Sequence, residues 1–245
     1  MGPASRPRSG FPAFKLDIAA VHSTPSRQSA KLTVVNTPSS PAWKAADRKL
    51  LQIVDSATAE AERKSGAWLV CRAGCAECCM GAFPINQLDA LRLRDGLAEL
   101  RLSDPERAER VVTRARDAVA RLRGEFPGDP VTGVLGESDA DQERFESFAD
   151  DEPCPALDPV TQTCDLYASR PMTCRLFGPA VRGEDGAVGA CELCYHGASD
   201  SEIAACAVET DPDGAESALT EKLEAETGAQ GSTIVAWCLA GLPKA

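Results

Sequence analysis

Apolar positions recur with helical spacing along much of the chain, and this pattern predicts a mainly α-helical protein. The first such segment begins at Pro41 and stops at Gly66, with a proline in the first turn and a glycine after the last turn, as is usual for helix ends. Its apolar side chains fall on one face, which predicts that this helix packs against a core. The positions concerned are Trp43, Leu50, Val54, Ala57 and Ala61.

The clearest predicted helix covers 105–122. Asp104 is a candidate N-cap, Pro105 occupies the first helical position, and Gly124 follows the end. An apolar stripe with a period near 3.6 residues predicts its buried face. The stripe consists of Ala108, Val111, Val112, Ala115, Val119 and Leu122.

Three further segments have the same periodicity. Residues 83–100 carry apolar side chains at Ile85, Leu88, Leu91 and Leu97, and two more helices are expected within 211–228 and 232–241. Residues 127–153 are rich in glycine, proline and acids and predict a loop, with a short helix near 141–148. Strands and helices do not alternate, so the fold class is a small helical domain with irregular cysteine-rich loops.

Residues 1–41 are rich in Pro, Ser and Arg and lack periodicity, which predicts a disordered tail before a single helical domain at 42–245. Residues 1–46 hold six basic and one acidic residue, and the rest of the chain holds 20 basic and 36 acidic residues. An acidic body argues against a nucleic-acid partner. Lys15 and Asp17 interrupt any apolar leader, and no membrane-spanning run is present, so we expect a cytoplasmic protein with no membrane partner.

Cysteines gather in two regions of the chain. In a reducing compartment, eleven cysteines indicate metal binding rather than disulfides. Closely spaced thiols in turn-like sequence can converge on one centre, and the helices between the two regions could form a hairpin that brings them together. Adjacent side chains diverge, however, so Cys78 and Cys79 rarely bind the same ion. The predicted metal ligands are Cys71, Cys75, Cys78, Cys79, Cys154, Cys164 and Cys174.

Other residues near these cysteines suggest supporting roles. Arg72, Arg170 and Arg175 are close to them in sequence and could offset the negative charge of several thiolates. Asp158 could be a turn residue, an acceptor for a ligand, or an oxygen ligand. Cys238 lies in an apolar helical stretch and is predicted to belong to the core.

The segments "CRAGCAECC", "PCPALD" and "CDLYASRPMTCR" resemble the YkgJ-type CxxCxxCC cysteine-cluster family, whose domain is described as zinc- or iron-chelating. The resemblance covers about residues 71–178, and the first spacing here is three residues rather than two. It implies a metal cofactor, zinc or iron, with an iron–sulfur cluster as one form. Flagellin lysine N-methylases are similar in carrying a related cluster, so a metal-dependent protein-modifying enzyme or an oxidoreductase is the alternative function.

A third group lies in "CELCYHG" and shortly after it. A C-x-x-C-x-H pattern with a nearby cysteine either forms a separate Cys₃His zinc site or completes the first site. The residues of this predicted second site are Cys191, Cys194, His196 and Cys206.

Two catalytic patterns were weighed against this interpretation. Cys71, Cys75 and Cys78 match the CxxxCxxC spacing of radical S-adenosylmethionine enzymes, but the α/β barrel that those enzymes require is not predicted. A Ser-His-Asp triad is not expected either, because the chain has two histidines and one lies in the predicted tail. The sequence therefore predicts a metal-binding protein and does not identify a protein partner.

Overall fold

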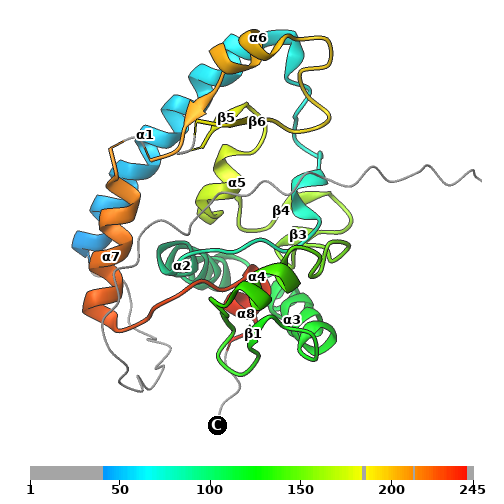
Figure 1. Ribbon diagram of the computed structural model, residues 1–245. Coiled ribbons are helices and arrows are strands. Elements are labelled where there is room, and N and C mark those ends of the chain that lie inside the picture. Colours follow the sequence, from blue (N-terminus) through cyan, green and yellow to red (C-terminus); the bar gives the residue numbers. More distant parts are fainter. Residues whose placement is uncertain (1–40, 184–185, 212, 242–245) are drawn as a thin grey trace, which may run out of the picture.

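A computed structural model describes residues 41–183, 186–211 and 213–241. Within these ranges the chain forms eight α-helices and short two-residue strands, which confirms the mainly α fold class (Figure 1). The predicted disordered tail lies outside the described residues except for its last position, where the first helix begins. None of the helices in the described ranges has the length and apolar character needed to cross a bilayer.

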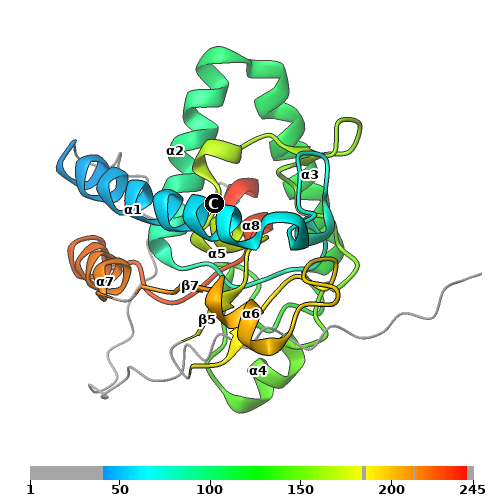
Figure 2. The ribbon, with the colours of Figure 1, turned by 90° about the horizontal axis from the view of Figure 1, so that it is seen from above.

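Helix α1 (Pro41–Ser65) has the predicted bounds, and α7 (Ala215–Thr227) lies beside it in both views (Figures 1 and 2). The indole Nε1 of Trp43 donates a hydrogen bond of 2.9 Å to Glu226 of α7. Apolar side chains of the two helices share one cluster, which includes Leu50 and Leu223. The stripe predicted for the first helix is thus buried in part against α7.

Helices α2 (Gln87–Ser103) and α3 (Pro105–Leu122) form a hairpin joined at a single residue, Asp104. Asp104 ends the first helix and caps the second, since its side chain accepts a hydrogen bond of 3.0 Å from Arg107 N. Both helices pack on α8 (Val235–Ala240) around the largest apolar cluster, which contains most of the stripe predicted for α3. Ile85 is buried as expected but precedes α2 and pairs with Thr233 in an antiparallel bridge.

The remaining elements are short. Strands β1 (Gly128–Asp129) and β2 (Val134–Leu135) form one hairpin, and β3 (Leu157–Asp158) and β4 (Thr163–Cys164) form another. Strand β5 (Val181–Arg182) lies between β6 (Val188–Gly189), its antiparallel partner, and β7 (Val208–Glu209), its parallel partner. Helix α4 (Asp139–Phe145) begins after its cap Ser138, a little earlier than predicted. Helices α5 (Met172–Leu176) and α6 (Asp200–Ala205) are too short to show a periodicity in the sequence.

Candidate metal centre

Backbone hydrogen bonds join the first cysteine region directly to the second. Cys154 N donates to Cys79 O at 2.7 Å, and Gly81 N donates to Glu152 O at 3.0 Å. Between these bonds, Met80 and Pro153 form an antiparallel bridge. Two segments that are remote in the sequence therefore lie edge to edge, with cysteines on both.

Electrostatic effects link four thiols near the place where these segments meet, and we call Cys78, Cys154, Cys164 and Cys174 the inner quartet. Burial raises the pKa of Cys174 well above its ordinary value, and negative charge on Cys154, Cys78 or Cys164 would raise it further. Burial likewise raises the pKa of Cys154 to about 12, with Cys164 and Cys78 adding to the effect. Because thiolates repel one another only when they are near, these mutual effects place the four thiols in one neighbourhood.

Cys79 is adjacent to the inner quartet in the chain but has a different environment. Its thiol is hydrogen-bonded to that of Cys78, and this contact is the main cause of a strongly raised Cys78 pKa, followed by burial. Both residues belong to a 3-10 turn, Glu77–Cys79. Of the vicinal pair, Cys78 is the residue whose negative charge would raise the pKa of each of the other three quartet thiols.

The β3–β4 hairpin positions the quartet residues that lie at its two ends. Asp158 closes the turn, since its carboxylate accepts hydrogen bonds from Val160 N at 2.8 Å and Thr161 N at 2.9 Å. These bonds, that of Thr161 first, lower the pKa of Asp158. Of the roles considered for Asp158, the structure shows the turn residue. Strand β4 pairs Cys164 with Leu157, and this register fixes the position of Cys164 along the hairpin.

A buried carboxylate fastens the same hairpin to α3. The side chain of Asp165 has no exposed surface and forms ion pairs with Arg107 and Arg114. Arg114 also donates to Pro155 O at 2.8 Å. The residues beside Cys154 and Cys164 are therefore held to a long, well-packed helix.

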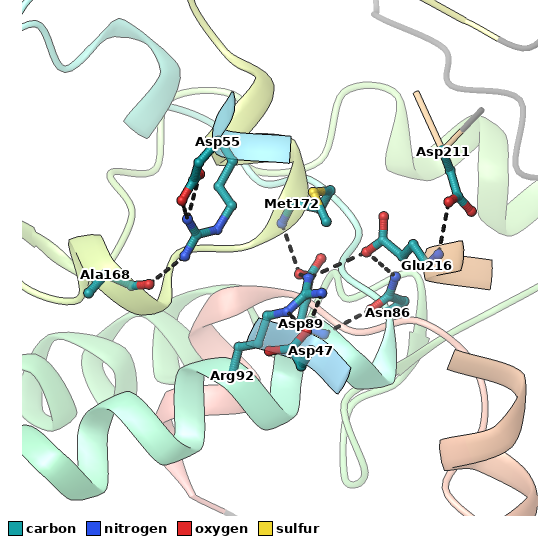
Figure 3. A network of polar contacts seen from close by, with 10 residues as sticks. Asp47, Asp55, Asn86, Asp89, Arg92, Ala168, Met172, Asp211 and Glu216 are labelled. Atoms are coloured by element: carbon teal, nitrogen blue, oxygen red, sulfur yellow. Dashed lines mark hydrogen bonds and ion pairs between the residues drawn. The ribbon is translucent and has the colours of Figure 1, made fainter. Parts of the chain in front are cut away.

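Helix α5, which carries Cys174, is capped by a residue from another helix. Asp89 of α2 accepts a hydrogen bond of 2.8 Å from Met172 N, the first amide of α5 (Figure 3). Asp89 also forms an ion pair with Arg92 at 2.7 Å, and Arg92 forms a second ion pair with Asp47 of α1 at 2.6 Å. Burial raises the pKa of Asp89 in spite of this arginine. No pattern in the sequence distinguished Asp89 from other polar residues of an amphipathic helix.

Of the arginines near the inner quartet, Arg175 differs from the expectation. The guanidinium of Arg175 pairs with Asp55 of α1 at 2.9 Å and donates to Ala168 O, so it links α5 to α1. Arg170 lies 3.9 Å from the centre of the Tyr167 ring. Its positive charge lowers the pKa of Cys164, although burial keeps the net shift upward. Arg170 is thus the arginine that offsets charge at the inner quartet.

The other two cysteines of the first region are near a different pair. We call Cys71, Cys75, Cys191 and Cys194 the outer quartet. Burial raises the pKa of Cys71 to about 11, and Cys75, Cys78, Cys194 and Cys191 raise it further, in that order. The thiol of Cys191 is hydrogen-bonded to that of Cys194 and is also influenced by Cys75.

Three cysteines of the predicted Cys₃His group lie in or against one apolar cluster, and its histidine is at the surface. His196 is exposed, and Cys206 is buried in an apolar cluster that also contains Cys194 and Tyr195. Cys238 is in the main core, as predicted, and its thiol lies 3.4 Å from Ala90 O.

The donor chemistry of the two quartets fits zinc or iron, since thiolates are preferred ligands of both. As the side chains stand, the described residues contain no group of three or more Cys, His, Asp or Glu side chains placed to hold a metal ion. A cysteine side chain has one rotatable bond, so its Sγ can turn toward a shared ion without moving the backbone. A cation would also supply the positive charge that a group of neighbouring thiolates needs.

Comparison with known proteins supports zinc or iron binding. The family model "CxxCxxCC: Putative zinc- or iron-chelating domain" matches residues 70–194. No curated protein and no solved structure matches the chain. The matched range extends beyond the resemblance seen in the sequence and includes Cys191 and Cys194.

Proposed function

Since the chain belongs to the CxxCxxCC family of zinc- or iron-chelating domains, we propose that it binds zinc or iron through thiolates, and that the inner quartet is its first centre. The observation that supports the proposal is the mutual electrostatic influence of four thiols from three separate segments, two of which are joined by backbone hydrogen bonds. One segment supplies Cys78, the β3–β4 hairpin region supplies Cys154 and Cys164, and α5 supplies Cys174. Cys79 is outside this set, although it belongs to the predicted seven.

Four thiolates suit either a tetrahedral zinc ion or an iron–sulfur cluster. Bound metal would link the three segments and contribute free energy of folding, because the unfolded chain does not hold them together. The protein's own residues support this role: Asp89 fixes the start of α5, and Arg170 reduces the negative charge at Cys164.

Metal binding is expected to depend on pH. Thiols with pKa values raised as far as that of Cys154, about 12, are protonated at neutral pH, and a metal must displace these protons. Affinity should therefore rise with pH. We place this chemistry in the cytoplasm, where thiols stay reduced. A lysine N-methylase-like enzyme and an oxidoreductase remain alternative predictions.

The test is metal content after anaerobic purification. We expect bound zinc or iron in the wild type, with absorbance in the visible range if an iron–sulfur cluster is present. Cys164→Ser should lose the metal of the inner quartet, whereas Cys238→Ser, a change in the main core, should retain it. Wild-type protein without zinc or iron, or equal metal content in the two variants, would contradict the proposal.

A further inference from the structure

Two short cysteine turns outside the inner quartet have the form of metal-binding knuckles. Cys75 N donates to Arg72 O at 2.9 Å, and Cys194 N donates to Cys191 O at 2.9 Å. In the first turn Gly74 has a φ of 88°, a conformation that favours glycine. The spacings C-x₃-C and C-x₂-C both fall within the range in which paired turns hold a tetrahedral ion.

Tyr195 fixes these two turns next to one another. Its backbone N donates to Trp68 O at 2.9 Å, three residues before the first turn begins. Its hydroxyl lies 2.6 Å from Ser65 Oγ at the end of α1 and accepts a hydrogen bond of 2.9 Å from Ala180 N. The residue is buried and has a φ of 60°, an unfavourable conformation for an aromatic residue. Three hydrogen bonds thus maintain a strained backbone directly after the second turn.

Electrostatic effects connect the thiols on these two turns, and Cys191 and Cys194 are also joined by a hydrogen bond between their side chains. Negative charge on Cys75, Cys194 or Cys191 raises the pKa of Cys71, and negative charge on Cys194 or Cys75 raises the pKa of Cys191. Negative charge on Cys78, which belongs to the inner quartet, also raises the pKa of Cys71. An apolar cluster that includes Trp68, Ala180 and Cys206 adjoins the second turn. The two turns thus carry four thiols, and the effect of Cys78 on Cys71 places the inner quartet next to them.

From this geometry we propose that the outer quartet is a second metal centre, a four-thiolate Zn²⁺ site separate from the inner quartet. The inference rests on the proposed function, because it assumes that this chain binds metal through thiolates. A shell of four cysteines leaves no open coordination position, which is typical of structural zinc sites. Its role would be to tie the segment that follows α1 to the segment that precedes α6.

The experiment counts metal ions on the metal-free full chain after addition of Zn²⁺ or Co²⁺. We expect two equivalents per wild-type chain by native mass spectrometry, and thiolate-to-cobalt absorption that saturates at two. Cys194→Ser and Cys164→Ser should each retain one equivalent, and their double variant none. Cys206→Ser, a change in the neighbouring apolar cluster, is the matched control and should retain two.

Other outcomes separate the two proposals. Wild-type saturation at one equivalent would overturn the second centre and leave the proposed function intact, and it needs no variant that folds poorly. A Cys194→Ser variant that keeps both equivalents, or a Cys164→Ser variant that loses both, would also overturn the second centre. A wild-type chain that binds neither ion would overturn the proposed function itself.

Discussion

At the scale of single residues, the vicinal pair shows how position along the backbone assigns chemistry. Cys78 and Cys79 are the same residue type in one 3-10 turn. Negative charge on Cys78, however, raises the pKa of Cys154, Cys164 and Cys174. The backbone carbonyl of Cys79 instead accepts the amide of Cys154. Adjacent side chains point in different directions, so one of the two can serve a centre while the other stays outside it.

The same substitution at these two positions should therefore have different effects. We expect Cys78→Ser to lose the metal of the inner quartet, since a serine oxygen is a poor substitute for a thiolate ligand. Cys79→Ser should keep that metal, because the backbone bond to Cys154 does not need the Cys79 side chain. Zinc and iron content by elemental analysis measures both. Equal loss from the two variants would show that Cys79 is also a ligand.

At the scale of elements, short irregular segments are held by buried polar contacts with the helices. Asp165 ties the β3–β4 hairpin to α3, and Asp89 caps α5 from α2. Tyr195 joins the second cysteine turn to the end of α1 through Ser65. Segments this short bury little apolar surface of their own, so such contacts determine where their thiols lie.

Removal of the Tyr195 hydroxyl tests this dependence. Tyr195→Phe leaves the buried Ala180 N without its acceptor, so the free energy of unfolding should fall by roughly 1–3 kcal/mol. The chain's other tyrosine provides the control: Tyr167 is 63% exposed, and Tyr167→Phe should change stability by less than about 0.5 kcal/mol. Urea denaturation of metal-loaded protein measures both changes. Similar values for the two variants would refute the anchoring role of Tyr195.

At the scale of the whole molecule, one arginine connects helices from distant parts of the sequence. Arg92 of α2 faces Asp47 of α1, Asp89 of its own helix and Glu216 of α7 (Figure 3). Three carboxylates around one positive charge leave an excess of negative charge. Burial first, and then Asp89, raise the pKa of Glu216 to about 7, while Arg92 opposes the shift. The packing of α7 is therefore coupled to protonation.

The sign of this coupling is fixed by the direction of the shift. A carboxyl whose pKa rises from 4.5 to about 7 on folding stabilises the fold fully below pH 4.5, and this contribution is lost as the pH rises through 7. The loss is up to about 3 kcal/mol, at 1.36 kcal/mol per unit of pKa.

A Glu216→Gln variant should lack this pH dependence. Between pH 5.5 and 8, the free energy of unfolding of the wild type should fall relative to that of the variant. Glu221→Gln, at an exposed position on the same helix, should follow the wild type. The measurement is urea denaturation across this range with metal content verified at each pH. Parallel curves for wild type and Glu216→Gln would rule out the coupling.

Much of the helical framework could be predicted from local patterns. Asp104, Pro105 and the apolar stripe after them predicted α3, because capping and periodicity are properties of neighbouring residues. The bounds of α1 followed from Pro41 and Gly66 in the same way. Helices α5 and α6 could not be predicted, since five or six residues contain too few turns to show a period. The bond from Asp89 to Met172 was equally hidden, because it joins residues that are remote in the sequence.

The sequence by itself determined that this is a helical domain with thiol-rich segments suited to zinc or iron, since helix formation and ligand chemistry depend on residue type and local spacing. Only the tertiary structure related the distant cysteines: Cys191 and Cys194 influence the thiol of Cys71, and Cys78 influences both that thiol and the thiols of the second region. It also placed His196 at the surface, whereas Cys194 and Cys206 are buried. The physical reason is that proximity between distant segments is set by backbone pairing, packing and buried ion pairs, which spacing along the chain does not encode.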